Sequence, residues 1–518
     1  MSRCRAPLFI QKNAVMTRLI FLFCNLLVMV SLAQGQAGVF AFSEDIGNPR
    51  MAGELAYDGS AQQYTLKGGG ANIWGVRDEF RYAYSRLKGD FILTANFSFE
   101  GKKDNHRKTG WMVRYSTGDD AAMCGAFLHG DGLTSMQWRE FPGQEMVNPG
   151  NETQAPKRNY EIIQLERRGQ EFVMRAAHRG EPLQVIASKT LTGLQGEVLA
   201  GIVCCSHDEA VTETARAWNV RIDQPVAGDY DPGRKGWIGC RLETMNVFDG
   251  KRKVIHESDG RFEAPNWMPD GERLLFNKNG SLFTIPIDGG EIEKLNTGTA
   301  ADLNNDHCIS FDGKLLGISH NDGKGSNVFW LPLRGGEPVK VTAEAPSYLH
   351  GWAPNNRELV YVAQRNNVPV YNIYRKDISG GEEVRLTNNQ KYEHVDGCEY
   401  SPDGKYIYYN GSENGGTMHL WRMKPDGSGK EQLTFDQYND WFPHISPDGK
   451  WIAFISFEPD IELNSHPSYK RVMLRLMPAS GGAPKVIACL YGGQGTINVN
   501  SWSPDSKHIA FVSNSGKR

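Results

Sequence analysis

The sequence lacks the short motifs that identify several large enzyme classes. It has no G-x-S-x-G stretch, so a serine hydrolase would be without its nucleophile turn. It also has no G-x-x-x-x-G-K-[ST] loop and no H-E-x-x-H pair, which argues against a P-loop nucleotide site and against a zincin metalloprotease. The sequence therefore carries none of these catalytic signatures.

Cysteine is scarce, and clusters of basic residues are absent. The 9 cysteines are scattered over 518 residues without a C-x-x-C pair, which disfavours zinc knuckles and a dense disulfide framework. We expect them to be buried free thiols. The net charge of −3 and the lack of a Lys/Arg cluster predict no nucleic-acid partner and no strong membrane association.

The long hydrophobic run of this chain lies near the N-terminus. Arg18 precedes the apolar run Leu19–Val30, and small residues follow it up to Ala37. This pattern predicts a secretory signal peptide over residues 1–37, with Met16 as an alternative start. We therefore expect a periplasmic or secreted protein, which could be associated with the cell surface.

Residues 38–225 show short β-rich segments and no convincing helical period. Gly, Asp and Asn turns separate the segments, as is typical of an antiparallel β-sandwich. The expected strands are Gln63–Leu66, Glu79–Tyr84, Phe91–Phe99, Gly110–Tyr115, Ala122–Leu128, Tyr160–Arg167, Glu171–His178 and Glu197–Cys205. A stretch with the Pro, Gly and Asp composition of a linker follows at residues 226–235.

Residues 236–518 repeat one hairpin unit, which is clearest in Tyr400–Tyr409. Pro402 presets φ for the first turn position, and Gly404 can take the left-handed conformation that an Asp-Gly turn needs. The equivalent turn positions 270, 312, 355, 403, 448 and 505 are 42, 43, 48, 45 and 57 residues apart. Periods of this length, with four strand-like segments each, predict the blades of a β-propeller.

The sixth repeat is divided between the two ends of this region. The last repeat stops after its second strand, His508–Ser513, whereas Glu243–Asp249 and Lys253–His256 resemble a third and a fourth strand without a first pair. Joining the two ends completes a sixth blade and leaves no exposed sheet edge between blades. The predicted fold is all-β: an N-terminal antiparallel β-sandwich followed by a six-bladed β-propeller.

Both regions resemble known families. The stretch Gly70–Gly75 followed by Gly89-Asp90-Phe91 resembles concanavalin-like jelly-roll domains, which often accompany carbohydrate-active or cell-surface proteins. The Ser-Pro-Asp-Gly-Lys hairpins with aromatic-rich third strands resemble the TolB-type propeller across residues 236–518. TolB is a periplasmic protein of the Tol–Pal system with an α/β domain before its propeller, whereas a β-sandwich is expected here. Related repeats occur in oligogalacturonate lyases and in prolyl-oligopeptidase-type peptidases, so the resemblance does not imply one activity.

Polar residues that could form a site gather before the first strand of several blades. In an up-and-down blade, these segments share one face of the disc with the loops between second and third strands, and they lead to the mouth of the central channel. The candidate ligand-binding residues at this mouth are Asn305, Asp306, His307, Tyr348, His350, His394, Asp396, Asp440, His444, Asn498 and Asn500. Such residues could hydrogen-bond a sugar or a peptide, or they could simply shape turns around a channel that holds water.

Four histidines of this set could hold a divalent metal as a cofactor. His307 and His350 occupy the same repeat position, and His394 and His444 lie in equivalent segments of later blades. Neutral imidazole is a common metal ligand, but three or four groups must converge within coordination distance.

Three tryptophans of the first domain have two interpretations. Trp74, Trp111 and Trp138 could form a sugar-stacking platform, or they could fill the core of the sandwich. The general burial of large apolar residues favours the core.

Three functions fit these features. The first is an exported binding or scaffold protein that holds a carbohydrate or a segment of an envelope protein at the channel mouth. The second is a metal-assisted carbohydrate-active enzyme, either a polysaccharide lyase or a glycoside-acting enzyme, in which a metal acidifies a proton beside a uronate carboxylate and a side-chain base removes it. The third is a purely structural envelope component. The lack of a catalytic motif favours the binding protein.

Overall fold

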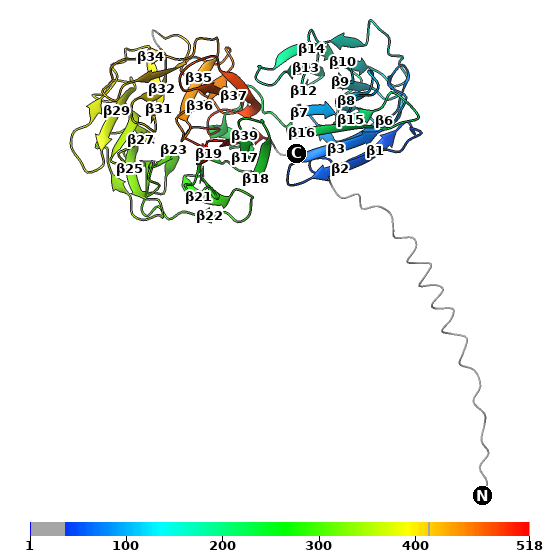
Figure 1. Cartoon of the computed structure of the whole chain (residues 1–518). Coiled ribbons are helices and arrows are strands. Elements are labelled where there is room, and N and C mark those ends of the chain that lie inside the picture. The colour runs from blue at the N-terminus through cyan, green and yellow to red at the C-terminus, as the bar shows by residue number, and fades with distance from the viewer. Residues whose placement is uncertain (2–36, 413–414, 517–518) are drawn as a thin grey trace.

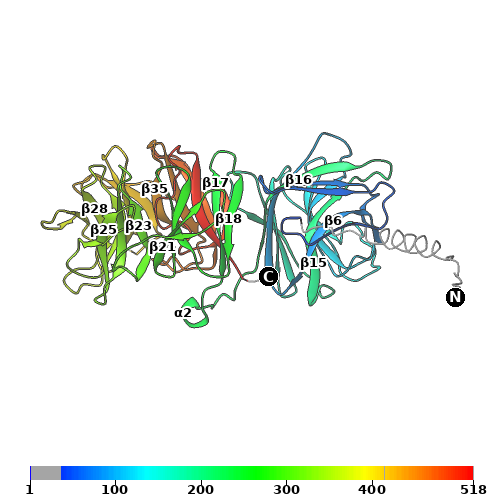
Figure 2. The same cartoon turned by 90° about the horizontal axis from the view of Figure 1, so that it is seen from below.

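The computed structural model describes residue 1, residues 37–412 and residues 415–516 (Figure 1). Apart from its two end residues, the predicted signal peptide lies outside the described residues. The architecture is all-β, as predicted, with a β-sandwich and a six-bladed propeller side by side (Figures 1 and 2). The short helix α2 (Pro232–Lys235) lies between the last strand of the sandwich and the first strand of the propeller.

The sandwich consists of two seven-stranded antiparallel sheets. In spatial order, the first sheet contains β1 (Phe42–Ile46), β6 (Phe80–Lys88), β15 (Glu197–Cys205), β8 (Lys108–Arg114), β9 (Met123–His129), β10 (Thr134–Arg139) and β11 (Glu152–Gln154). The second contains β14 (Gln184–Thr190), β13 (Glu171–Ala177), β12 (Ile162–Arg168), β7 (Phe91–Phe99), β16 (Glu213–Asp223), β3 (Gln63–Gly68) and β2 (Glu54–Asp58). Each of the eight expected strands is present, with ends shifted by a few residues at most.

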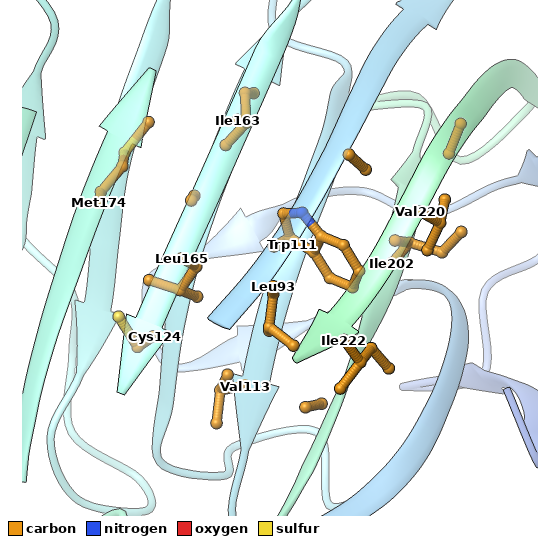
Figure 3. Close-up of a cluster of buried hydrophobic side chains, with 14 of the residues drawn as sticks. Leu93, Trp111, Val113, Cys124, Ile163, Leu165, Met174, Ile202, Val220 and Ile222 are labelled. Carbon is orange, nitrogen blue, oxygen red and sulfur yellow. The ribbon is translucent and has the colours of Figure 1, made fainter. Parts of the chain in front are cut away.

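Alternating side chains from the two sheets meet in one hydrophobic core (Figure 3). Trp111 is fully buried at the centre of this core, near Leu93, and Trp138 is also buried in it. Trp74 lies elsewhere, half-buried against a second apolar cluster on the outer side of the first sheet. Two of the three tryptophans therefore fill the core, and these two cannot form a sugar platform.

The seven cysteines within the described residues are free thiols, and six of them are buried. Burial raises the pKa of Cys240 and of Cys489 to about 12, so these thiols stay protonated. Within the same described residues, no helix is long and apolar enough to cross a membrane.

Five propeller blades are four-stranded antiparallel sheets in simple sequence order. Blade one contains β19 (Glu263–Trp267), β20 (Arg273–Lys278), β21 (Ser281–Pro286) and β22 (Glu293–Lys294). Blade two contains β23 (Leu303–Ile309), β24 (Leu315–Asn321), β25 (Ser326–Pro332) and β26 (Val339–Lys340). Blade three contains β27 (Ser347–Trp352), β28 (Glu358–Ala363), β29 (Asn372–Asp377) and β30 (Val384–Arg385). Blade four contains β31 (His394–Tyr400), β32 (Ile407–Ser412), β33 (His419–Met423) and β34 (Glu431–Gln432), and blade five contains β35 (Asn439–Ile445), β36 (Trp451–Phe457), β37 (Lys470–Pro478) and β38 (Lys485–Gly492).

The repeated turn owes its geometry to hydrogen bonds within the motif. In the fourth blade, the Ser401 hydroxyl donates to Asp403 Oδ1 at 2.8 Å and accepts from the backbone N–H of Tyr406 at 3.0 Å. Asp403 Oδ1 also accepts from the N–H of Lys405 at 3.1 Å, while Gly404 takes a φ of 70°. Since these contacts all lie within six residues, the turn forms from local sequence alone.

The ring closes through a sixth blade made from both ends of the propeller region, as predicted. Strand β17 (Gly239–Asn246) lies between β39 (His508–Ser515) and β18 (Arg252–Ser258). The pairing of β17 with β39 runs from Gly239 opposite Ser515 to Asn246 opposite His508. The third strand thus begins four residues before the predicted Glu243, because β39 extends to Ser515 and supplies partners for those residues.

The sandwich contacts the propeller beside this sixth blade (Figure 2). The buried Glu243 carboxylate of β17 binds Arg221 of β16 at 2.6 Å and Arg252 of β18 at 2.7 Å. Burial raises the pKa of Glu243, but the two guanidinium groups outweigh burial and leave the pKa well below its ordinary value. One buried carboxylate therefore joins a strand of the sandwich to two strands of the propeller.

Candidate functional site

A cavity of about 550 Å³ lies at the mouth of the propeller channel. All six blades contribute to its wall, through the beginnings of their inner strands and through loops between second and third strands. The predicted site residues in this wall are Asn305, Asp306, Tyr348, His350, His394, Asp396 and Asn498. The structure thus brings together residues that are up to 193 positions apart in the chain.

β-Bulges in three inner strands supply part of the cavity wall, to which regularly paired residues such as Tyr348, His394 and Asp396 also contribute. In β23, regular pairing stops after Leu303 and resumes at His307, so the three residues Asn304, Asn305 and Asp306 lie opposite the single residue Ser319 of β24. All three bulge residues line the cavity, whereas the regularly paired His307 does not. A bulge leaves its residues outside the ladder and redirects their side chains, which explains this division.

Bulges also occur in the inner strands of the third and fifth blades. His350 is the unpaired extra residue of β27, and Phe442 lies in the bulge of β35. Both side chains line the cavity. His307 and His350 therefore share a repeat position but not an environment, because the bulges in their strands fall at different places.

The four predicted residues outside the cavity wall are His307, Asp440, His444 and Asn500. His444 is buried, with Nδ1 2.9 Å from Glu399 Oε2 and Nε2 2.7 Å from the carbonyl oxygen of Ile497. Asp440 is also buried and accepts hydrogen bonds from Ser456 at 2.6 Å and from Arg475 at 3.2 Å. Their polar atoms thus serve contacts within and between blades.

The other two residues outside the cavity wall are His307, which is buried, and Asn500, which is half-buried. Burial lowers the pKa of His307 to about 4, so its imidazole is neutral at neutral pH. Asn500 donates to Glu399 and to the carbonyl oxygen of Ile445, which ties the sixth blade to the fourth and fifth.

An ion pair between blades three and four forms the charged centre of the cavity. His350 Nε2 lies 2.7 Å from Asp396 Oδ1, and His466 Nε2 lies 3.7 Å from Asp396 Oδ2. Burial lowers the pKa of His350, but the Asp396 carboxylate outweighs burial and leaves the pKa raised. Burial likewise raises the pKa of Asp396, and the imidazolium reverses this and leaves it far below its ordinary value. Each partner therefore favours the charged form of the other, an imidazolium beside a carboxylate.

Asp306 lies near this pair but is not neutralised by it. Burial raises the pKa of Asp306 from 3.8 to about 6, although the charge of His350 lowers it in part. Its side chain accepts a hydrogen bond from Asn304 Nδ2 at 2.7 Å. Asp306 therefore changes its charge near pH 6, in a cavity where the pKa values of His394 and His466 are lowered by burial.

Several cavity residues escaped the sequence prediction. Trp237, Tyr371 and Phe442 give the wall aromatic faces, and Arg261 forms an ion pair with Glu263. The wall residues that add further polar groups without having been predicted as site residues are Asn277, Asn279, Asp302, Asn304, Asn464, His466 and Gln494. His466 and Asn464 lie in the long segment between β36 and β37, whose length and place in the repeat do predict a position on this face.

The four histidines named as metal ligands do not meet in one place. His350 and His394 line the cavity, whereas His307 and His444 lie outside its wall. Within residues 37–412 and 415–516, no three His, Cys, Asp or Glu side chains are arranged to hold a metal ion.

Comparison with known proteins places the C-terminal half in a family. No family model matches the chain. An uncharacterised protein of Agrobacterium fabrum is 41% identical over 282 residues, covering 54% of this chain and 94% of that protein. The dipeptidyl-peptidase 5 of Porphyromonas gingivalis is 24% identical over 290 residues, which is 52% of this chain but 40% of the peptidase.

A solved structure from Agrobacterium tumefaciens, whose name assigns it provisionally to TolB, superposes on the same region. It is 40% identical, with a TM-score of 0.50, and the match covers 54% of this chain and 99% of the solved one. This identity extends over nearly the whole solved protein, and the blade count and ring closure agree with a TolB-type propeller. The chain therefore belongs, through its C-terminal half, to the TolB-like six-bladed β-propeller proteins, and it carries a β-sandwich ahead of that propeller.

Proposed function

We propose that this protein is an exported binding protein that holds a ligand in the cavity at the propeller mouth. The observation that carries the proposal is the wall of the cavity, in which all six blades place amide, carboxyl, imidazole or aromatic groups around about 550 Å³. Concave sites with a few convergent polar groups are the usual binding sites of proteins. A carbohydrate or a segment of an envelope protein fits this chemistry.

Export rests on the signal-like N-terminal sequence. Arg18, the apolar run Leu19–Val30 and the small residues up to Ala37 have the pattern of a cleaved leader. The periplasmic role of TolB, to whose propeller this one is related, supports the same location. A periplasmic or secreted protein would meet carbohydrates and envelope proteins rather than nucleic acids.

A carbohydrate-active enzyme is the second candidate, and one observation favours it. The carboxyl of Asp306 has a pKa of about 6, and the His350–Asp396 pair lies in the same cavity. A carboxyl that exchanges protons near neutral pH can act as a general acid or base beside a bound sugar. The binding protein remains the preferred function, because it needs only the cavity.

A ligand screen on the full chain tests the proposal. Isothermal titration calorimetry with neutral oligosaccharides, uronate oligosaccharides and short peptides should find a ligand whose affinity falls at least tenfold in His350→Ala. His508→Ala is the matched control, since His508 lies at the start of β39, next to a Ser-Pro-Asp turn on the opposite face of the disc. Binding that is equal in both variants would move the site away from the mouth. Release of unsaturated or shortened sugars from the oligosaccharides would favour the enzyme.

A further inference from the structure

We infer that the mouth cavity selects a ligand with a positively charged nitrogen group, an ammonium or a guanidinium, and that Asp306 binds this group beside the paired rings of Tyr348 and Tyr371. The inference rests on the proposed binding function and names the chemistry of the ligand. It follows from the charges in the cavity wall, from the environment of Asp306 and from the aromatic rings around it.

The cavity wall has an excess of negative charge. Its carboxylates are Glu263, Asp302, Asp306 and Asp396, and its cationic groups are the guanidinium of Arg261 and the imidazolium form of His350. Among the residues that the structure describes, no lysine lines the cavity, and burial lowers the pKa of its other two histidines. Two negative charges therefore remain when the wall is ionised.

These charges are not evenly compensated. Glu263 is paired with Arg261, and Asp396 is paired with His350. Asp302 is exposed at the rim, where it accepts a hydrogen bond from Asn321 at 3.0 Å. Asp306 is 6% exposed, and its carboxylate is stabilised by an amide rather than by a cation in contact.

An unpaired buried carboxylate is unfavourable, and a ligand cation would remove that penalty. Burial raises the pKa of Asp306, with a further rise from the charge of Asp396. A cation in contact with Asp306 would supply the missing opposite charge, so binding and ionisation of Asp306 favour each other. A neutral ligand could offer this carboxylate a hydrogen bond but no compensating charge, and an anionic ligand would be repelled by it.

Two tyrosines complete the proposed subsite. The rings of Tyr348 and Tyr371 are 6.1 Å apart between centroids, and both rings line the cavity. Both rings line the same cavity as Asp306 and Asp396, and the charges of these carboxylates, after burial, raise the pKa of each phenol. An ammonium or guanidinium group is attracted to aromatic faces as well as to carboxylates.

Small probes distinguish the sources of the cation. N-acetyl-lysine amide carries only a side-chain ammonium, glycinamide carries only an α-ammonium, and N-acetylglycinamide carries neither. Calorimetric titration should detect one or both charged probes and show at least tenfold weaker binding of the neutral one. Asp306→Asn should weaken the charged probe at least tenfold, whereas Glu382→Gln, which removes an exposed charge from a turn on the opposite face, should leave it unchanged.

The pH dependence is a second readout that loss of folding would not imitate. Between pH 6.5 and pH 5.0 the ionised fraction of a carboxyl with a pKa of about 6 falls roughly eightfold. His350 stays protonated in this range because its pKa is raised above 6.5. Burial lowers the pKa of His394 and of His466, and any protonation of these rings would weaken cation binding in the same direction. Asp306→Asn should therefore remove the share of the pH effect that comes from Asp306.

Other results would overturn the inference. These are equal binding of charged and neutral probes, no effect of Asp306→Asn, or no binding of either charged probe at 10 mM, a concentration chosen for weak fragments. A neutral or anionic ligand that depends on His350 but not on Asp306 would overturn the cation subsite while leaving the mouth as the binding site.

Discussion

Replacing Asp306 by asparagine should stabilise the propeller at neutral pH. In the folded protein, burial raises the pKa of this carboxyl from 3.8 to about 6. The folded state therefore resists ionisation of Asp306 more than the unfolded state does, and stability falls as the pH rises from about 4 to about 6. An asparagine has nearly the same shape, can still accept the hydrogen bond from Asn304, and carries no charge.

The expected gain follows from the two pKa values. A rise from 3.8 to about 6 corresponds to about 3 kcal/mol of destabilisation once the carboxyl is ionised in both states. At pH 7.5 the variant should recover about this amount. At pH 4 the carboxyl is mostly protonated when folded and about half protonated when unfolded, so the gain should shrink to under about 1 kcal/mol.

Differential scanning calorimetry of the full chain at both pH values measures this effect. For a domain of this size, about 3 kcal/mol raises Tm by about 6 °C at pH 7.5. Asp302→Asn is the matched control, because it removes an exposed carboxyl at the same mouth and should shift Tm by less than about 1 °C. A Tm for Asp306→Asn that is unchanged or lower at pH 7.5, or a gain that is equally large at pH 4, would refute the argument.

Four other substitutions test the packing of both domains. Glu243→Gln should lower the free energy of unfolding by about 3–5 kcal/mol, because two buried guanidinium groups lose their carboxylate. Calorimetry should then show separate unfolding transitions for the sandwich and the propeller, and a single unchanged transition would contradict this. Gly201→Ala should destabilise the sandwich by at least about 2 kcal/mol in urea unfolding, since a Cβ would lie 2.0 Å from the carbonyl oxygen of Ala83. A variant as stable as the wild type would contradict the pairing of β15 with β6. In urea unfolding, Trp111→Ala should lower the free energy of unfolding by about 3–5 kcal/mol, and Trp74→Ala should lower it by less than half as much. Equal losses in the two variants would contradict the different burial of the two rings.

Asp306 has opposite expected effects on stability and on the proposed binding. The group that should bind a cation, Asp306, is also a group whose ionisation weakens the fold. Stabilising substitutions that reduce function are expected where a site keeps a charge buried without a partner. Asp306→Asn is therefore expected to give a more stable protein that binds its ligand less well.

The inner strands show how far the repeat pattern predicts the site. The repeat predicts Asn305, Asp306, His350 and Asp396 before the first strands of their blades, whereas in the structure they lie within β23, β27 and β31 and line the cavity. It gives His307 and His350 the same position, yet only His350 lines the cavity wall. The difference arises from the bulges of β23 and β27, which fall at different residues and depend on how neighbouring blades pack.

The sequence by itself determined the all-β class, the hairpins and the closing of the ring. Each hairpin is made by contacts within six residues, such as those between Ser401, Asp403 and Tyr406, and the unmatched strands at the two ends complete one blade by count. Only the tertiary structure decided which polar groups share the mouth. Asp306, His350 and Asp396 come from three different blades, and their charges depend on burial and on one another, which no local pattern records.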